Sequence, residues 1–219
     1  MKIAVFGTGN VGATIGNKLI ELGHEVMMGS RTRDNEKALA FVAAHSGKAL
    51  NGTFEDAAAF GEMIFNCTSG GGSVDALKSV HGSHLKGKVI IDVANPLDFS
   101  HGMPPVLIPE LSNTNSLGEE IQKQFPDALV VKTLNTMWCG LMVNPKLVND
   151  GDHTVFVCGN DAAAKSKVSD LLKSFGWPES AILDLGDITS ARGTEMYLPI
   201  WLRIWGATKN GTFNMRIMR

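Results

Sequence analysis

The chain has 219 residues, with 20 Lys and Arg against 22 Asp and Glu, which gives a net charge of −2. This length predicts one domain, or one domain with an elaboration, whose core is large enough to fold without metal ions or disulfides. A charge so close to zero provides no overall attraction for nucleic acid or for anionic membrane lipids. Glycine is in excess, with 24 residues against an average share of about 7%. This excess indicates tight turns or close approach of the backbone to a ligand.

Cysteine usage and the N-terminus indicate the compartment. The three cysteines form no CxxC pair and no cluster with histidine: Cys67, Cys139 and Cys158. They predict neither a disulfide framework nor a zinc site, as is typical of a reducing compartment. The first apolar run, residues 3–6, stops at Gly7 and is too short for a signal peptide. Residues 196–207 are also apolar but contain Pro199 and are too short to span a bilayer. We therefore expect a cytoplasmic protein that does not associate with membranes.

Apolar runs alternate with helix-period segments from the N-terminus to about residue 190, which is typical of βαβ units and a mostly parallel sheet. Strands are predicted at residues 2–6, 25–28, 63–67, 88–93, 128–133, 154–158 and 182–185. Helices are predicted at residues 11–22, 35–45, 54–60, 74–80, 117–125, 162–175 and 190–208. Most of the strands are apolar along their whole length, so we expect helices on both faces of the sheet. The predicted fold class is α/β, with a doubly wound sheet and a small C-terminal α/β extension.

Two segments stand outside this alternation. Residues 96–115 carry four prolines and read as a long ordered loop: Pro96, Pro104, Pro105 and Pro109. This loop follows a strand end, where α/β proteins bind ligands. In the last helical stretch, Trp201 and Trp205 lie four residues apart on one face. Aromatic residues mostly supply buried area, so a core position or a subunit interface is favoured over a substrate wall.

A glycine-rich turn follows the first predicted strand. Residues 7–12 form a G-x-G-x-x-G directly before a predicted helix: Gly7, Thr8, Gly9, Asn10, Val11 and Gly12. In a dinucleotide site the first glycine allows the tight turn, the second lets the backbone reach a pyrophosphate, and the third lets the helix pack closely. The free N–H groups at the helix start would bind the diphosphate. The strand–turn–helix context favours a Rossmann nucleotide site over a chance turn.

The tip of the second predicted strand indicates which nucleotide binds. NAD enzymes carry Asp or Glu about 20 residues beyond the glycines, whereas NADP enzymes use arginine for the 2′-phosphate. Here the strand ends in Ser30 and Arg31, and Arg33 follows. A serine hydroxyl and a planar guanidinium suit a phosphate, so NADP is favoured over NAD. The alternative is a solvated basic loop in which Asp34 caps the next helix; this accounts for Arg33 better than for Ser30 and Arg31.

With these motifs the sequence resembles the NADPH-dependent coenzyme F420 reductase family, also called coenzyme F420-dependent NADP oxidoreductases. The resemblance covers essentially the whole chain. It is carried by Gly-Thr-Gly-Asn-Val-Gly at 7–12, Gly-Ser-Arg at 29–31, Asp-Val-Ala-Asn-Pro at 92–96, Lys-Thr-Leu-Asn-Thr-Met at 132–137, Val-Cys-Gly-Asn-Asp at 157–161 and Asp-Leu-Gly-Asp at 184–187, with Ala191, Arg192 and Glu195. The family is also similar to the NADPH-binding domain of membrane-bound metalloreductases, so the resemblance does not specify the hydride acceptor.

The resemblance implies roles for single residues. Residues 8–11 would bind the pyrophosphate, and Ser30 with Arg31 would bind the 2′-phosphate. Thr68 and Ser69 would flank the ribose. The residues implied near the nicotinamide are Asn95, Thr136 and Met137. The sequence departs from the archaeal members at residues 69–72, Ser-Gly-Gly-Gly in place of an aliphatic-Pro turn, and at Asn135, where they tend to have His.

Hydride transfer between two flat heterocycles needs oriented stacking and exclusion of water, and it needs no acid/base pair. The sequence shows no catalytic triad, paired carboxylates or metal-ligand spacing. His81 and His84 are interpreted as solvated and Cys139 as a small apolar residue. Asn135 and Trp138 are the candidates for shaping the acceptor pocket.

The function predicted from the sequence is an NADP(H)-dependent oxidoreductase. It would transfer a hydride between NADPH and a flat small-molecule acceptor, with coenzyme F420 or a flavin as the candidate co-substrate. One alternative is a non-catalytic NADPH sensor. Another is a β-hydroxyacid-type dehydrogenase with Lys146 as general acid and Asn149 orienting substrate, although Pro145 disfavours the helical presentation that such enzymes use. Residues 1–130 would form the NADP-binding Rossmann core. Residues 131–219 would form the acceptor cleft and a homodimer face within the same compact unit.

Overall fold

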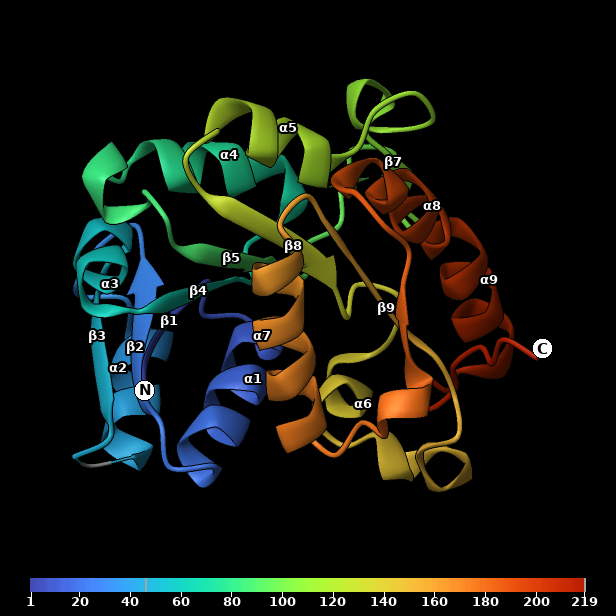
Figure 1. Ribbon diagram of the computed structural model, residues 1–219, viewed down its shortest axis with the longest axis horizontal. Helices are drawn as coiled ribbons and strands as arrows, with labels where there is room; N and C mark the ends of the chain where they lie inside the picture. Colours follow the sequence, from blue (N-terminus) through green and yellow to red (C-terminus); the bar gives the residue numbers. More distant parts are fainter. Residues whose placement is uncertain (46, 219) are drawn as a thin grey trace.

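A single eight-stranded sheet organises the computed structural model, which describes residues 1–45 and 47–218. The strand order is β10-β9-β8-β5-β4-β1-β2-β3, and helices cover both faces (Figure 1). The strands are β1 (Lys2–Phe6), β2 (Glu25–Ser30), β3 (Ala49–Thr53), β4 (Met63–Asn66), β5 (Val89–Asp92), β8 (Leu129–Thr133), β9 (Val155–Gly159) and β10 (Ile182–Asp184). Strands β1 to β5 and β8 run parallel, while β9 is antiparallel to β8 and parallel to β10. The expected α/β fold with a mostly parallel, doubly wound sheet is confirmed.

Two buried clusters hold the helices against the sheet. The helices are α1 (Asn10–Glu21), α2 (Glu36–Ala44), α3 (Phe54–Phe60), α4 (Gly70–Lys78), α5 (Leu117–Gln124), α6 (Cys139–Val143), α7 (Ala162–Ser174), α8 (Ala191–Met196) and α9 (Leu198–Thr208). Within β1, Ile3 and Val5 join the cluster that contains α1, α2, α6 and α7, whereas Ala4 and Phe6 join the one that contains α3, α4, α5 and α8. Successive side chains of a strand point to opposite faces, so an apolar strand supplies both layers.

Strand β3 is the main element that the sequence pattern misses. Its residues read Ala-Leu-Asn-Gly-Thr, and only Ala49 and Gly52 are buried. It pairs with β2 alone, at the edge of the sheet. An edge strand needs little apolar sequence, because one side and part of each face lie in solvent.

Glycine and proline shift the bounds of two predicted helices. Helix α4 begins at Gly70, not at residue 74. A Cβ on Gly70 would lie 2.0 Å from the Asn95 carbonyl oxygen, so the close approach of helix start and chain requires glycine. The predicted stretch 190–208 is two helices, α8 and α9, and Pro199 lies in the first turn of α9, where proline is tolerated.

Two further segments lie outside the eight-stranded sheet. The proline-rich loop contains a short antiparallel pair, β6 (Leu97–Asp98) and β7 (Val106–Leu107). The chain after α9 returns to β9, where the Thr154 N–H donates to the Met215 carbonyl at 2.9 Å. The Trp201 ring stacks on Phe213 with centroids 5.3 Å apart. Within the described ranges, no helix has the length and apolar character needed to cross a bilayer.

Candidate functional site

A cavity of about 1240 Å³ lies at the carboxyl ends of β1, β2, β3 and β4. Parallel strands end at the same edge, so the segments after them converge there. Seven of the predicted site residues line the cavity: Gly7, Thr8, Gly9, Ser30, Arg31, Thr68 and Ser69. The glycine turn, the β2 tip and the segment after β4 therefore face a common space that can hold a nucleotide.

Four helices begin at this cavity, and two of them, α1 and α4, lack side-chain caps. The N-cap residues of α1 and α4 are Gly9 and Ser69, and neither side chain accepts a hydrogen bond from the helix. Four other helices are capped by side chains, those of Asn35, Thr53, Ser116 and Asp161. The first N–H groups of a helix need acceptors and carry the positive end of its dipole. At α1 and α4 these donors are left for a ligand with anionic or polar oxygens.

The glycines of the turn have separate physical reasons. Gly7 has φ +104°, a conformation that side chains rarely adopt. A Cβ on Gly12 would lie 2.0 Å from the Gly7 carbonyl oxygen, so this position brings helix and turn together. A Cβ on Gly9 would meet no described protein atom within 4 Å. Packing within the described residues therefore does not require glycine at position 9, whereas close approach of a ligand would.

The three polar residues at the β2 tip have different surroundings. The Ser30 hydroxyl donates to the Thr32 carbonyl at 2.6 Å and so closes the turn. The Arg33 guanidinium donates to both carboxylate oxygens of Asp56, at 2.8 and 2.6 Å, and Arg33 does not line the cavity. Arg33 and the Thr53 hydrogen bonds hold the pKa of the Asp56 carboxyl well below its usual range. Arg31 lines the cavity and joins no ion pair among the described residues. Of these three residues, Arg31 is thus the free cation available for a phosphate.

The junction of β3 and α3 completes the cavity, and sequence reasoning missed it. Thr53 and Glu55 line the space, as do Asp75 of α4 and Ser79, the residue that follows α4. The Glu55 carboxylate accepts from His84 Nδ1 at 2.9 Å, so His84 is not simply solvated. The available signal was the capping box formed by Thr53 and Asp56 at the start of α3.

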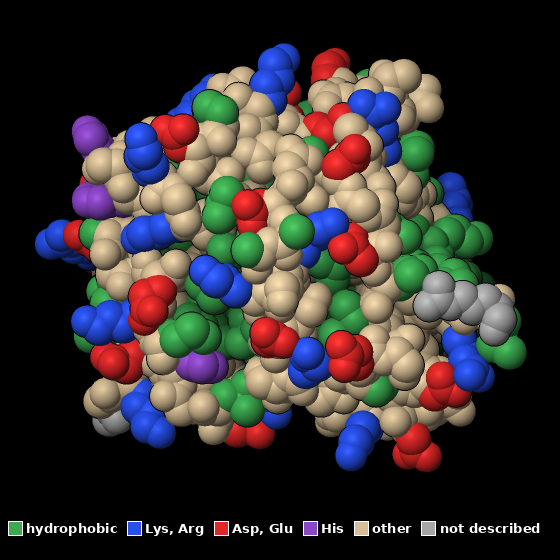
Figure 2. Space-filling view, in the orientation of Figure 1, with side chains coloured by type: hydrophobic (Ala, Val, Ile, Leu, Met, Phe, Trp, Pro, Cys, Tyr) green, Lys and Arg blue, Asp and Glu red, His purple; other side chains and the backbone are tan. Residues whose placement is uncertain are grey.

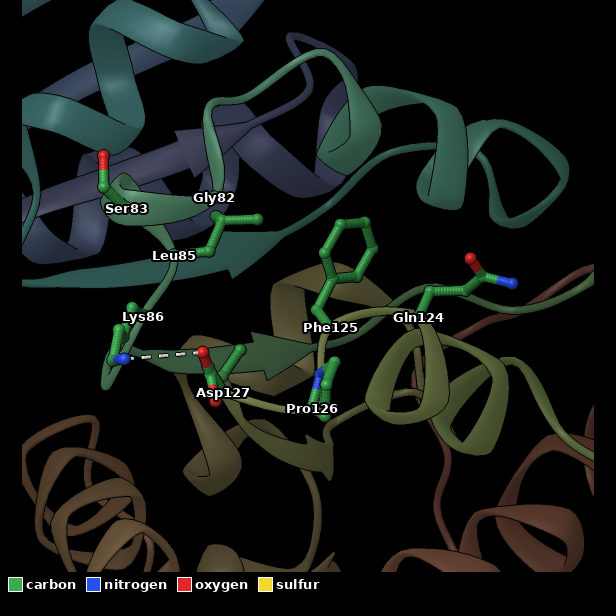
Figure 3. A pocket seen from close by; sticks show the side chains of 9 residues that line it. Gly82, Ser83, Leu85, Lys86, Gln124, Phe125, Pro126 and Asp127 are labelled. Atoms are coloured by element: carbon green, nitrogen blue, oxygen red, sulfur yellow. Dashed lines mark ion pairs between the residues drawn. The ribbon is translucent and has the colours of Figure 1, made fainter.

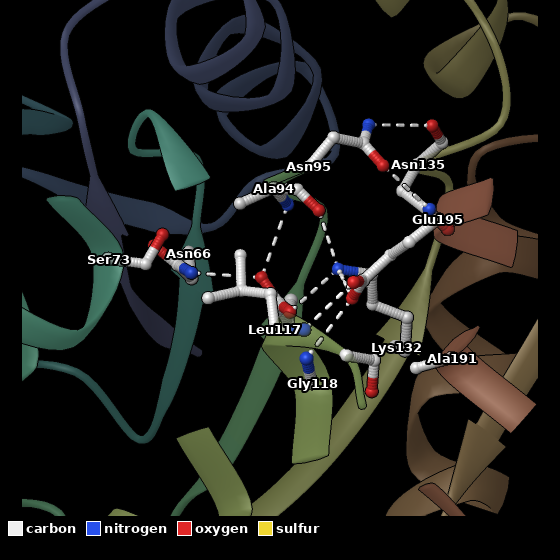
Figure 4. Close-up of polar contacts among 12 residues, drawn as sticks. Asn66, Ser73, Ala94, Asn95, Leu117, Gly118, Lys132, Asn135, Ala191 and Glu195 are labelled. Carbon is white, nitrogen blue, oxygen red and sulfur yellow. Dashed lines mark hydrogen bonds and ion pairs between the residues drawn. The ribbon is translucent and has the colours of Figure 1, made fainter. Parts of the chain in front are cut away.

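The residues expected near the nicotinamide do not line this cavity. Asn95 Nδ2 donates to the Asn135 carbonyl and Asn135 Nδ2 donates to Asn95 Oδ1, both at 2.9 Å. This reciprocal pair, shown in Figure 4, joins the ends of β5 and β8. Thr136 and Met137 are buried, and Met137 belongs to the core cluster. Trp138 begins α6, is 42% exposed and packs against Gly211 of the C-terminal segment.

A buried ion network lies next to the asparagine pair (Figure 4). Lys132 Nζ lies 2.9 Å from Asp92 and 2.7 Å from Glu195, and all three side chains are at most 1% exposed. Glu195 also accepts from the N–H groups of Leu117 and Gly118, at 2.8 and 3.1 Å, and so holds the start of α5. Burial alone would lower the pKa of Lys132, but the two carboxylates raise it, so Lys132 stays charged. Burial raises the pKa of Glu195.

Burial makes two of the three cysteines poor nucleophiles. Burial raises the pKa of the Cys67 thiol, which lines the cavity, and raises that of Cys158 to about 12. Thr14 Oγ1 donates to Cys139 Sγ at 3.7 Å. Thiols with raised pKa values are poor nucleophiles. In the described ranges, no group of three or more His, Cys, Asp or Glu could hold a metal ion.

Two other regions are weaker candidates for a functional site: the turns that hold Lys146 and Asn149, and a second cavity. Lys146 and Asn149 are exposed, lie in separate short turns, Pro145–Leu147 and Asn149–Gly151, and do not line the cavity. A second cavity, of about 270 Å³, lies at the amino ends of β5 and β8 (Figure 3). It has one ion pair, between Lys86 and Asp127 at 3.7 Å, and no glycine turn. The strand ends that α/β folds use for ligands are at the other edge.

The fold and the cavity define a Rossmann nucleotide-binding protein, and comparisons assign its family. Residues 2–96 match the family described as NADP oxidoreductase coenzyme F420-dependent. The crystal structure of an Arthrobacter sp. FB24 protein, provisionally described as an F420-dependent NADP reductase, is 50% identical over 100% of both chains, with a TM-score of 0.92. The chain therefore belongs to the coenzyme F420-dependent NADP oxidoreductase family, whose nucleotide is NADP(H).

More distant matches include three kinds of reductase. The F420-dependent NADP reductase of Methanocaldococcus jannaschii is 25% identical, over 91% of this chain and 90% of its own. Rat metalloreductase STEAP3 is 28% identical over 91% of this chain, which spans only 38% of that relative's length. An imine reductase from Aspergillus terreus in complex with NADPH4 shares the fold, with 16% identity and a TM-score of 0.62 over 95% of this chain and 62% of its own.

Proposed function

We propose that this protein transfers a hydride between NADPH and a flat electron acceptor, such as a deazaflavin or a flavin. The observation that carries the proposal is a cavity that combines the uncapped start of α1 with Arg31, which has no ion-pair partner among the described residues. Helix N–H groups suit a pyrophosphate, and a free guanidinium at the β2 tip suits the 2′-phosphate that distinguishes NADP from NAD. Family membership supports the same nucleotide.

The chain's own residues bind and orient the reactants in this proposal. The bound nicotinamide supplies the hydride chemistry. The Asn95–Asn135 pair would fix the ends of β5 and β8 as a rigid floor beside the ring, because each side chain is held by the other residue. Trp138, half-exposed at the next helix start, would form a wall against which a flat acceptor stacks.

We place the acceptor cleft between the nicotinamide end, the 96–115 loop and the C-terminal helices. Residues 1–130 would serve as the nucleotide core and residues 131–219 as the acceptor side of the same unit, in a cytoplasmic homodimer. Figure 2 shows hydrophobic side chains gathered where α9 lies in Figure 1. Ile200 and Trp205 of α9 are 52% and 38% exposed, which supports a second copy packing there. Light scattering of wild type and Ile200→Glu tests the dimer: the proposal requires that the variant dissociate.

Stopped-flow oxidation of NADPH tests the proposed activity. The acceptors are deazaflavin, free flavins, ferric chelates and quinones, each offered with NADPH and with NADH. We expect single-turnover reduction of at least one flat heterocycle, and a preference for NADPH. Tight NADPH binding without turnover of any acceptor would favour the NADPH sensor instead. Faster turnover of a 3-hydroxy acid with NADP would favour the β-hydroxyacid-type dehydrogenase.

A further inference from the structure

A line of hydrogen-bonded side chains connects the buried ion network to the nucleotide cavity. It runs from Lys132 through Asp92 and Asn66 to Thr68, which lines the cavity. Asn66 and Asp92 are completely buried and Thr68 is partly exposed. Figure 4 shows Asn66 between the ion network and Ser73 of α4. The charged pair of Lys132 and Asp92 at one end determines which group donates and which accepts in each hydrogen bond of this line.

Asp92 can only accept hydrogen bonds. Lys132 has three ammonium hydrogens, and three acceptors surround them: Asp92, Glu195 and the Ala94 carbonyl, at 2.9, 2.7 and 2.5 Å. The other oxygen of Asp92 lies 2.9 Å from Asn66 Nδ2 and 3.1 Å from the Ala94 N–H. Because a carboxylate has no hydrogen to give, Asn66 must turn its amide nitrogen toward Asp92. Its amide oxygen then faces Thr68.

The orientation of Asn66 decides the orientation of the Thr68 hydroxyl. Thr68 Oγ1 lies 2.6 Å from Asn66 Oδ1 and must donate its single hydrogen there. Ser73 Oγ lies 2.7 Å from the same Thr68 oxygen and 3.3 Å from the Ser69 carbonyl. Because the Thr68 hydrogen is already given to Asn66, the shorter contact requires the single Ser73 hydrogen, and in it Ser73 is the donor. The Thr68 hydroxyl is left with one lone pair and no hydrogen for the cavity. It can accept a further hydrogen bond and cannot donate one.

We propose that Asp92, acting through Asn66, is a positioning residue that keeps Thr68 an acceptor, and that Thr68 binds a sugar hydroxyl of the nucleotide. This inference rests on the proposed function, which brings NADP(H) into the cavity. A phosphate oxygen only accepts hydrogen bonds and would be repelled by the Thr68 lone pair, although Thr68 lies beside the phosphate-binding turn. A ribose hydroxyl donates one hydrogen bond and is complementary to it.

The test is a thermodynamic cycle between Thr68 and the sugar hydroxyls. Calorimetry measures binding to the full chain, without any electron acceptor, of NADPH and of analogues that each lack one ribose hydroxyl. We expect Thr68→Val to weaken NADPH about three- to tenfold, the factor of one net hydrogen bond. Thr68→Ser should lose less than about twofold, since it keeps the hydroxyl. For one analogue, the loss of affinity for wild type should equal the loss of NADPH affinity that Thr68→Val causes. Thr68→Val should not weaken the binding of that analogue any further.

Equal weakening of NADPH and every analogue by Thr68→Val would overturn the inference, because a phosphate contact or a structural role would act on all of them alike. Thr14→Val is the matched control, since Thr14 does not line the cavity, and it should leave all affinities unchanged. A protein that shows the cycle but reduces no acceptor would contradict the proposed activity and leave this inference standing.

A variant of Asn66 tests whether Asp92 and Asn66 orient the Thr68 hydroxyl. Asn66→Leu releases the Thr68 hydrogen, so discrimination between NADPH and the informative analogue should fall toward onefold. Asn66→Ser, which is too short to reach both neighbours, replaces it if the leucine variant does not fold. Discrimination as strong as in wild type would overturn the role of Asp92 and Asn66.

Discussion

The two ends of the site edge solve the same problem in opposite ways. At β1, β2 and β4, helices α1 and α4 begin without side-chain caps and Arg31 has no ion-pair partner among the described residues. At β5 and β8, Lys132, Asp92 and Glu195 satisfy one another, and Asn95 and Asn135 do the same. At β1, β2 and β4 hydrogen-bond donors stay available for a ligand, and we call this the open end of the site. At β5 and β8 the donors are bound by other side chains of the protein and make the structure rigid, and we call this the closed end. Binding and stability should therefore respond to different substitutions.

The largest expected effect is at the closed end. Lys132→Met leaves two buried carboxylates unpaired, so the free energy of unfolding should fall by about 3–5 kcal/mol. Urea denaturation measures it. The control is Lys173→Met, which removes an exposed pair with Asp170 and should cost less than about 1 kcal/mol. Similar losses in the two variants would mean that the buried network contributes no more than a surface pair.

The next effect concerns binding at the open end. Arg31→Ala should weaken NADPH by about 1.5–3 kcal/mol, as expected for a hydrogen bond to a charged group, and should spare NADH. Arg33→Ala is the matched control: it removes an arginine that is already paired with Asp56 and should change neither affinity by more than about twofold. Titration calorimetry with both nucleotides decides. Equal loss of NADPH and NADH in the Arg31 variant would refute the 2′-phosphate assignment.

The glycine run at the start of α4 lies where the open and closed ends of the site meet, because Gly70 contacts the chain after β5. Gly70→Ala forces a Cβ against the Asn95 carbonyl and should destabilise the protein by about 1–3 kcal/mol, the usual cost of overpacking. Gly72→Ala, where a Cβ meets no described atom within 4 Å, should leave stability nearly unchanged. Thermal melts compare the two. A harmless Gly70→Ala would show that the helix start can move away from β5.

The smallest effect is a pH dependence at Asp56. Its pKa is lowered in the folded state, so its contribution to stability is complete above the unfolded pKa near 4 and is lost as the pH falls through the folded pKa. Asp56→Asn should therefore cost up to about 1 kcal/mol at pH 7, and the gap to wild type should narrow below about pH 4. Urea denaturation from pH 7 to pH 3 measures this gap. A gap independent of pH would mean that the carboxylate charge contributes nothing.

Local sequence patterns predicted most of the strands and helices and the phosphate-binding part of the site. The apolar strands and the position of residues 7–12 between strand and helix required only near neighbours in the chain. The polar edge strand β3 escaped prediction because pairing with β2, and not burial, holds it in place. The capture of Arg33 by Asp56 escaped it too, since 23 residues separate them.

The sequence by itself determined the α/β order of elements, the phosphate-binding turn and the presence of arginine at the β2 tip, because steric and chain-local rules govern them. Only the tertiary structure decided that Lys132 meets Asp92 and Glu195, and that Asn95 meets Asn135. Those contacts join residues 40 or more positions apart in sequence. Their chemistry depends on removal from water and on the direction of each hydrogen bond, and both exist only after β5, β8 and α8 have packed together.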